Sequence, residues 1–441
     1  MTSRFRRLAA GAAAAMALVT LAACGSGGGS SASSSGPVTL TFWTWLGTGP
    51  TQKLANEFTK THPNIKVNVV NAGRSQEEYT KLDTALKAGK GAPDIAQIEY
   101  FALPQYAITQ HLVNLSGTSA ASVIKSKFTP AAQRQVTVNG GIYAFPQDVG
   151  PMAMFYRKDL FKKAGLKPPK TWAQYAADAA AIHKKLPQTY MGNVDPGDPG
   201  TATSLMWQAG ATPFRTTGTT HVTVNLDQPA VRKWASLWSG LLEKKLVTTD
   251  TGWTASWWHG MAAGRYATWI TGAWAPVSMY AAIAQTKSDW AVAPIPQWTP
   301  GAHVDAQNGG SSSAVLSSSP HKAQAIEFLE WLDSSQQGAK QLANLGLFPP
   351  TKALLNSPSW LNAPQRMLDN QKANKVLAQA GDDVAPGWQY LPYQVYANSV
   401  FADSVGHDIS AGKNLIPGLQ AWQKSIVSYG NSQGFSVKTG S

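Results

Sequence analysis

Tryptophan is the residue type whose abundance in this chain points most directly to chemistry, with seventeen in 441 residues. Several lie near expected strand ends or in segments rich in Gly and Pro: Trp43, Trp45, Trp253, Trp257, Trp258, Trp269, Trp274, Trp298 and Trp388. A flat ring packs against the C–H-bearing face of a pyranose, while the hydroxyl edges of the sugar need planar polar partners. Rings beside Asp, Asn and Gln in a mostly apolar cleft therefore predict a carbohydrate site, although most of these tryptophans are expected to be core.

Sequence-local motifs for catalysis and metal binding are absent. The eight histidines are scattered and none precedes a glutamate, and no G-x-S-x-G elbow, phosphate loop or G-x-G-x-x-G fingerprint occurs. The single cysteine, Cys24, allows neither an intramolecular disulfide nor a cysteine metal cluster. We therefore expect no catalytic residue, metal or cofactor. A glycosidase assembles its two acids from distant segments, so a secreted glycan hydrolase or lyase stays an alternative, with Asp148 and Glu99 as its candidate acids.

The elements that would position these residues alternate between strands and helices. Residues 38–42 and 65–69 alternate apolar and polar side chains as strands do, and between them Leu54 and Phe58 share one helix face. Strand, helix and strand so close together make a βαβ unit with a parallel pair of strands. This opening predicts an α/β fold.

The alternation continues along the chain. Residues 79–89 predict a helix stopped by Gly89, and residues 94–98 predict a short strand. Thr171 is expected to cap one helix, and Ser319 followed by Pro320 is expected to cap another. About 400 residues exceed what one hydrophobic core usually holds, so two lobes are expected.

The N-terminus predicts export. Three arginines precede an apolar run over residues 8–22, which is shorter than the about 20 residues that a helix needs to span a bilayer core. A basic start, a short apolar middle and small residues before a break predict a secretory signal over residues 1–23. The break, LAACG over residues 21–25, resembles the bacterial lipobox. That resemblance implies that the Cys24 thiol is lipidated and anchors the protein to the outer face of the cell membrane.

Residues 24–37 continue after Cys24 almost wholly as Gly and Ser, and such a segment is expected to form a flexible tether. The formal net charge is +13, but the basic residues are spread, and the densest patch, residues 157–170, is interpreted as a solvated helix face and loop. Nucleic-acid binding usually shows as basic residues clustered on one face, so no nucleic-acid partner is expected. The positive charge leaves an anionic ligand open.

Residues 38–435 resemble the family 1 extracellular solute-binding proteins of ABC importers, the maltose-binding type. The stretches that carry the resemblance, in the expected order, are VTLTFW (38–43), GAPDI (91–95), GIYAFPQD (141–148), FYRKDLF (155–161), AGL (164–166), PPKTW (168–172), GMAAGRYATW (260–269), GAW (272–274), GG (309–310), KAQAIEFL (322–329) and PP (349–350). Each stretch alone is weak evidence. Their common order behind a lipobox and a tether makes the resemblance specific.

The resemblance implies a type II periplasmic-binding-protein-like fold, in which two α/β lobes are joined by hinge crossings and the ligand lies between them. One lobe would comprise residues 38–148 plus 304–350, and the other residues 151–303 plus 351–441. The crossings are expected near residues 148–151, near 303 and near 349–350. Proline at two of these crossings would limit the hinge motion to few dihedrals.

The family's ligand-contacting positions carry over to several residues of this chain. Trp274, in the Gly-x-Trp motif, looks like the sugar-stacking ring. Asp148 and Gln147 stand at the first crossing, where a carboxylate can accept two sugar hydroxyls. The alternative for Asp148 is a hydrogen bond within the hinge, and for Trp274 a place in the core.

Further candidates follow expected strand ends, because doubly wound sheets place ligands beyond the carboxyl ends of their strands. These candidates are Trp43, Trp45, Gln97, Glu99 and Tyr100, and at least one of the two tryptophans is expected to face the cleft. The second crossing would contribute amide or backbone groups of Asn308, Gly309 and Gly310, and Trp388 is included by its position alone. The DPGDPG stretch over residues 195–200 predicts a turn rather than a calcium loop.

These expectations combine into one functional hypothesis. A monomeric lipoprotein captures a mono- or oligosaccharide by hinge closure and delivers it to a membrane permease, whose transport a separate ATPase drives. A sensor that presents its ligand to a membrane receptor would share this fold and site. Transport of a polyol, a glycerol phosphate or a uronate is a further alternative.

Overall fold

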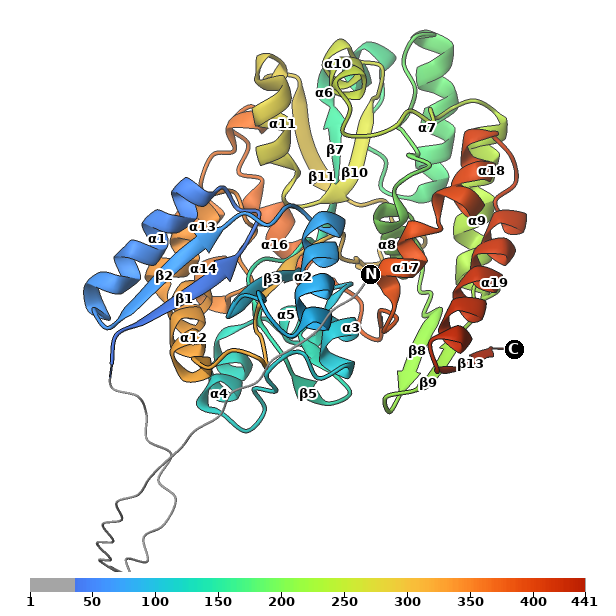
Figure 1. The fold of residues 1–441 in the computed structure, drawn as a ribbon. Coiled ribbons are helices and arrows are strands. Elements are labelled where there is room, and N and C mark those ends of the chain that lie inside the picture. The colour runs from blue at the N-terminus through green and yellow to red at the C-terminus, as the bar shows by residue number, and fades with distance from the viewer. Residues whose placement is uncertain (1–35, 441) are drawn as a thin grey trace, which may run out of the picture. The chain divides into compact units, whose positions relative to one another are not determined.

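A five-stranded sheet and two three-stranded sheets organise residues 36–440, which are the residues that the structure, a computed structural model, describes (Figure 1). The predicted signal over residues 1–23, the lipidation site Cys24 and nearly all of the tether lie outside the described residues. Within residues 36–440, no helix combines the length and the apolar character that crossing a membrane requires.

The first sheet contains the strand that opens the chain. Its order is β2-β1-β3-β12-β6, formed by β1 (Val38–Trp43), β2 (Ile65–Val70), β3 (Ile95–Glu99), β6 (Phe145–Pro146) and β12 (Ser311–Val315). β1 pairs in parallel with β2 and β3, and β12 runs antiparallel between β3 and β6. The helix α1 (Thr48–Thr61) joins β1 to β2 and buries Leu54 and Phe58, which confirms the predicted βαβ unit.

The second sheet has the order β10-β7-β11, with β7 (Met152–Arg157) antiparallel to both β10 (Thr268–Gly272) and β11 (Trp290–Pro294). Successive side chains of β7 enter two different hydrophobic clusters. Met152 and Met154 pack into one cluster, and Ala153 and Phe155 pack into the other. The sheet is therefore covered by apolar side chains on both faces.

The remaining elements cover these sheets or form smaller ones. The helices of the described chain are α2 (Gln76–Ala88), α3 (Leu103–Ile108), α4 (Ser119–Lys127), α5 (Pro130–Gln135), α6 (Lys158–Ala164), α7 (Trp172–Lys185), α8 (Pro199–Gln208), α9 (Pro229–Glu243), α10 (Ala255–Ala263), α11 (Ala275–Ile283), α12 (Lys322–Leu329), α13 (Gln336–Asn344), α14 (Lys352–Leu355), α15 (Pro358–Leu361), α16 (Asn374–Asp382), α17 (Gln394–Ser399), α18 (His407–Ser410) and α19 (Ile416–Ser432), with short 3-10 segments η1 (Ala284–Thr286) and η3 (Arg366–Leu368) and π segments η2 (Glu330–Ser334) and η4 (Ala402–Gly406). The other strands are β4 (Thr137–Val138), β5 (Gly141–Ile142), β8 (Phe214–Thr217), β9 (His221–Val224) and β13 (Ser436–Thr439). In Figure 1, α19 lies beside the sheet that β13, β9 and β8 form.

Two of the three predicted helix ends are confirmed. Gly89 ends α2 in the left-handed conformation, with φ of 64°, and the Thr171 hydroxyl accepts the N–H of Gln174 to cap α7. The predicted cap at Ser319 is wrong, because α12 begins only at Lys322. The Ser319 hydroxyl instead donates to the Asp94 carboxylate and accepts the N–H of His321, so it serves the turn before the helix.

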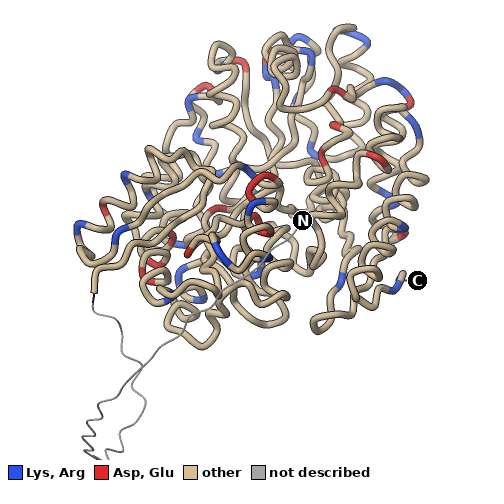
Figure 2. Tube along the Cα trace, in the orientation of Figure 1, with Lys and Arg blue, Asp and Glu red and all other residues tan. Residues whose placement is uncertain are grey.

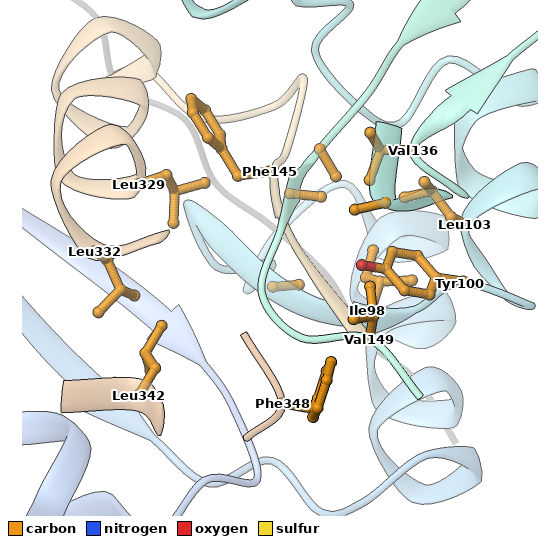
Figure 3. Packing of buried hydrophobic residues seen from close by; sticks show 14 of the residues in the cluster. Ile98, Tyr100, Leu103, Val136, Phe145, Val149, Leu329, Leu332, Leu342 and Phe348 are labelled. Atoms are coloured by element: carbon orange, nitrogen blue, oxygen red, sulfur yellow. The ribbon is translucent and has the colours of Figure 1, made fainter. Parts of the chain in front are cut away.

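Three chain crossings lie side by side between the two main sheets. Residues 147–151 lead from β6 to β7, and the N–H of Asn308 donates to the carbonyl of Gly150 at 2.7 Å. The N–H of Val149 donates to the carbonyl of Phe348 at 3.1 Å, which brings in the third crossing. Figure 3 shows Val149 beside Tyr100, and Phe348 belongs to the same hydrophobic cluster. The second crossing, predicted near residue 303, pairs with the first at residues 306–308.

Candidate ligand-binding cavity

A cavity of about 870 Å³ is lined by residues from the side of the first sheet and by residues from the side of the second sheet. This volume is in the range that ligand sites usually occupy. The lining residues used below are Trp45, Asn71, Arg74, Glu77, Gln97, Glu99 and Asp148 from the side of the first sheet, Asn193, Asp195, Asp198, Trp253, Trp269, Thr271, Trp274 and Val277 from the side of the second, and Asn308, Gly309 and Gly310 from the crossing.

Trp45 reaches the cavity because a buried amide holds the loop that carries it. The side-chain oxygen of Gln97 accepts the N–H of Trp45 at 3.3 Å and the hydroxyl of Thr44. Gln97 is buried on β3, so its carbonyl end is used to position the loop after β1. Trp43, two residues earlier, packs against the first hydrophobic cluster and does not line the cavity. Of these two tryptophans, the structure therefore brings only Trp45 to the cavity.

Asp148 lines the cavity and also ties the first crossing to the second. Its Oδ1 accepts the N–H of Ser311 at 2.7 Å, and only 5% of the residue is exposed. Burial raises the pKa of this carboxyl to about 7, although the Ser311 hydrogen bond opposes the shift. Both expected roles of Asp148 are therefore compatible with the geometry, because one oxygen serves the hinge and the residue borders the cavity.

The raised pKa of Asp148 makes stability depend on pH. The folded protein keeps this carboxyl protonated up to about pH 7, whereas the unfolded chain releases the proton near pH 4. Its stabilising contribution is therefore fully present below about pH 4 and is lost as the pH rises to about 7. Asp148→Asn keeps an Oδ1 acceptor for Ser311 and should flatten part of this dependence, as urea unfolding at about pH 5 and about pH 8 would measure. If the free energy of unfolding changes equally between the two pH values in the wild type and in Asp148→Asn, Asp148 does not cause the pH dependence.

Tyr100 and Gln147 lie behind the cavity wall rather than in it. The Tyr100 hydroxyl donates to the carbonyl of Asp148 at 2.7 Å, and the Gln147 amide donates to the Ser313 hydroxyl at 3.3 Å. Both side chains are almost fully buried and neither lines the cavity. Tyr100 and Gln147 were predicted to contact the ligand. In the structure they instead support Asp148 and β12 from behind the cavity wall.

Glu99 borders the cavity at the carboxyl end of β3. Its carboxylate accepts the Tyr79 hydroxyl at 3.1 Å. Burial raises the pKa of Glu99, while hydrogen bonds from Ser75 and Tyr79 and the positive charge of Arg74 oppose the shift. Glu99 and Asp148 both belong to the side of the first sheet, so the two candidate acids do not face each other from opposite sides of the cavity.

Asn308, Gly309 and Gly310 of the second crossing line the cavity. The side-chain amide of Asn308 donates to the Thr201 hydroxyl at 2.9 Å. The backbone carbonyl of Asn308 accepts the indole N–H of Trp274 at 2.8 Å. Gly310 has φ of 96°, and a Cβ there would lie 2.7 Å from the Tyr100 ring. This crossing therefore needs glycine for both its backbone conformation and its close approach to Tyr100.

Trp274 belongs to a cluster of tryptophan rings on the side of the second sheet. Its centroid lies 5.6 Å from that of Trp253 at an interplanar angle of 29°, and 5.7 Å from that of Trp269 at 75°. Trp257 and Trp258 of α10 complete the cluster. Rings in contact with one another and with the cavity form a continuous aromatic wall.

Trp388 lies away from the cavity. Its ring stacks on Trp207 at 5.3 Å and 10° and contacts Phe214 edge-on, so it belongs to the second hydrophobic cluster. Its predicted place at the site, which rested on position alone, is corrected to packing.

Several cavity-lining residues were not among the predicted site residues: Asn71, Arg74, Glu77, Asn193, Asp195, Asp198, Trp253, Trp269, Thr271 and Val277. Arg74 could have been predicted from the sequence, because it follows the end of β2 just as Trp45 follows the end of β1. Asp195 and Asp198 lie in the stretch that was predicted to turn. The turn is present, and Asp198 caps α8 by accepting the N–H of Thr201.

The sequence matches the model of the family described as bacterial extracellular solute-binding protein over residues 44–339. The chain belongs to this family. The resemblance noted in the sequence is thereby confirmed.

Relatives of this solute-binding protein can be aligned with it over most of its length. It is 28% identical over 398 residues to the arabinooligosaccharide-binding protein of Bacillus subtilis (strain 168), an alignment that covers 88% of each chain. It is 39% identical, with a TM-score of 0.80, to the ABC transporter associated binding protein from B. animalis subsp. lactis Bl-04, solved in complex with beta-1,6-galactobiose; the match covers 91% of this chain and 99% of that one.

A second solved structure shows the same fold at lower identity. The galacto-N-biose-/lacto-N-biose I-binding protein of the ABC transporter from Bifidobacterium longum, in complex with lacto-N-biose, has a TM-score of 0.79 and 25% identity over 91% of this chain and 99% of that one. The predicted α/β fold of the two-lobe, type II periplasmic-binding kind is thereby confirmed.

Proposed function

We propose that this solute-binding protein captures a mono- or oligosaccharide in the cavity and delivers it to the permease of an ABC importer. The observation that carries the proposal is the composition of the cavity wall, where the rings of Trp45, Trp253, Trp269 and Trp274 stand beside amide and carboxylate groups. Such a wall suits the apolar faces and hydroxyl edges of a sugar. A relative named as an arabinooligosaccharide-binding protein, and two similar structures solved with beta-1,6-galactobiose and lacto-N-biose, support the same class of cargo.

Capture proceeds by closure of two lobes about the crossings. The lobes comprise residues 38–148 plus 304–350 and residues 151–303 plus 351–441, with the paired segments near 150 and 308 as part of the hinge. A ligand favours the closed form only if it binds that form more tightly than the open one. Groups such as Gln97 and Trp274, which come from opposite sides, provide that difference when one saccharide contacts both.

The charges around the cavity favour an uncharged cargo over a glycerol phosphate or a uronate. Among its described lining residues the cavity has one Arg or Lys, Arg74, and five acidic residues, Glu77, Glu99, Asp148, Asp195 and Asp198. Figure 2 shows the Lys and Arg residues scattered over the elements of the described chain. The positive charge of the whole chain therefore does not describe the cavity, and an anion there would lack cationic donors.

A glycan hydrolase has less support than a binding protein. The two acids would have to flank the scissile bond. Asp148 and Glu99 instead lie on the same side of the cavity, and protein groups already donate hydrogen bonds to both. Family membership also favours binding over catalysis.

The proposal includes a lipid anchor at Cys24 that keeps the protein at the outer face of the membrane. The lipobox-like LAACG stretch and the Gly/Ser tether after it support this location. Cys24→Ala is expected to release the protein into the medium, which cell fractionation measures. A protein that stays with the membrane after this substitution would contradict the anchor.

Isothermal titration calorimetry against a saccharide panel tests the function. The panel contains β-1,6-galactobiose, lacto-N-biose and arabinooligosaccharides, with mannitol and galacturonic acid as comparisons. At least one saccharide is expected to bind with a Kd in the micromolar range or tighter, about −8 kcal/mol or better. Absence of heat with every saccharide would refute the proposal, and new reducing ends after incubation would favour the hydrolase.

A further inference from the structure

Trp253 combines features that packing alone does not require. It is the most exposed of the large apolar side chains in the described part of the chain, at 47%, and it lines the cavity. Its φ is 63°, a conformation that a bulky side chain rarely adopts. Backbone strain of this kind gathers where function demands a particular orientation.

A hydrogen-bond network centred on Asp195 holds the backbone next to Trp253 in place. The Asp195 carboxylate accepts the N–H of Gly252 through Oδ2 and the N–H of Gly197 through Oδ1, both at 2.8 Å. A Cβ on Gly252 would lie 2.6 Å from Asp195 Oδ2, so glycine allows this close approach. Asp195 therefore fixes the turn before α10 and orients the indole of the next residue.

Arg74 meets this indole from the other side of the cavity. It follows β2 of the first sheet, whereas Trp253 precedes α10 beside the second sheet. The Arg74 Cζ lies 5.8 Å from the centroid of the Trp253 ring, within the distance of a cation–π contact. On its own side, Trp253 is supported by stacking on Trp274. Arg74, Trp253 and Trp274 thus form a continuous contact across the cavity.

We propose that Arg74 and Trp253 form a clasp across the cavity, positioned by Asp195, and that this clasp sets how long a bound ligand is retained. The part about retention rests on the proposed function, because it needs a ligand between the two sides. The contact itself contains no ligand atom. It therefore favours the closed arrangement of the two sides whatever the ligand is.

Fluorine NMR of the protein labelled with 5-fluorotryptophan tests the clasp without any ligand. Trp253→Phe assigns the Trp253 resonance by its disappearance. Arg74→Ala is expected to shift that resonance and increase its solvent-isotope shift, because the guanidinium no longer covers the ring. The matched control is Arg232→Ala, which removes an exposed arginine paired with Asp227 and should leave the resonance unchanged. A Trp253 resonance that Arg74→Ala does not move would overturn the clasp.

Two substitutions at Trp253 test the strained backbone. Trp253→Gly and Trp253→Ala both remove the indole, but only glycine adopts positive φ at no steric cost. The Gly variant is expected to unfold at a higher urea concentration than the Ala variant. An Ala variant at least as stable as the Gly variant would show that Asp195 does not hold residue 253 in the left-handed conformation.

Stopped-flow release of β-1,6-galactobiose tests retention. Arg74→Ala should release the sugar about 2- to 30-fold faster, the range that corresponds to a cation–π contact, and Trp253→Ala, which also removes a ring of the cavity wall, should speed release at least as much. The double variant should be no faster than the faster single variant, because the two residues act as one pair. Unchanged release, or effects that simply add, would overturn the role in retention. If no saccharide of the calorimetric panel binds, the proposed function fails while the NMR experiment still decides the clasp.

Discussion

Trp274→Ala is expected to weaken saccharide binding by at least about tenfold, or about 1.4 kcal/mol, without unfolding the protein. The ring lines the cavity, contacts Trp253 and Trp269, and is only partly buried. Its removal takes away a platform for the sugar and loosens the wall around it. Calorimetry measures the affinity, and thermal unfolding checks that the fold is intact.

Two further variants separate the reasons for that loss. Trp274→Phe keeps a ring but removes the indole N–H that donates to the Asn308 carbonyl, so it should fall between the wild type and Trp274→Ala if stacking matters. Trp388→Ala removes a ring that packs on Trp207 away from the cavity and should leave the affinity unchanged. If Trp274→Ala binds as tightly as the wild type, Trp274 is not part of the site.

Gly150→Ala is expected to abolish tight binding and to destabilise the protein by about 1–3 kcal/mol or more. A Cβ at this position would lie 2.1 Å from the carbonyl oxygen of Asn308, which is a backbone atom and cannot move aside like a flexible side chain. The same oxygen accepts the indole N–H of Trp274. The substitution therefore disturbs the pairing of two crossings and the placement of the aromatic wall together.

Gly117→Ala provides the control for this substitution. A Cβ there would meet no atom within 4 Å, so stability and affinity should stay close to those of the wild type. Urea unfolding and calorimetry on both variants measure the difference. A Gly150→Ala protein that binds and unfolds like Gly117→Ala would contradict the close pairing of the crossings.

The opening of the fold could be predicted because its side-chain periods are regular. Alternation over β1 and β2 and the helix face between them predicted a parallel pair, and the structure contains it. Ser319 was misleading because the hydrogen bond that its hydroxyl donates to Asp94 joins segments far apart in the sequence. Such tertiary competition for a capping side chain leaves no local signal.

The site was partly predictable through the rule that ligands lie beyond the carboxyl ends of strands. Applied to β1 and β3, the rule led to Trp45 and Glu99, and applied to β2 it would also have led to Arg74. The rule cannot distinguish Trp45 from Trp43, because the Gln97 contact that holds the loop is not visible in the sequence.

Trp253 shows what a sequence does not reveal. It was one of many tryptophans outside any periodicity, and neither its positive φ nor its contact with Arg74 has a local signature. The charge of the cavity was equally hidden, since a chain with net charge +13 surrounds it with acidic residues. Both features arise from segments that only the fold brings together.

A structure determined with the saccharide that calorimetry identifies tests the central claim most directly. The account predicts that the sugar lies in the cavity, stacked on the aromatic wall and hydrogen-bonded to groups from both sides, such as Gln97 and Asn193. A sugar bound outside the cavity, or held by one side alone, would contradict it.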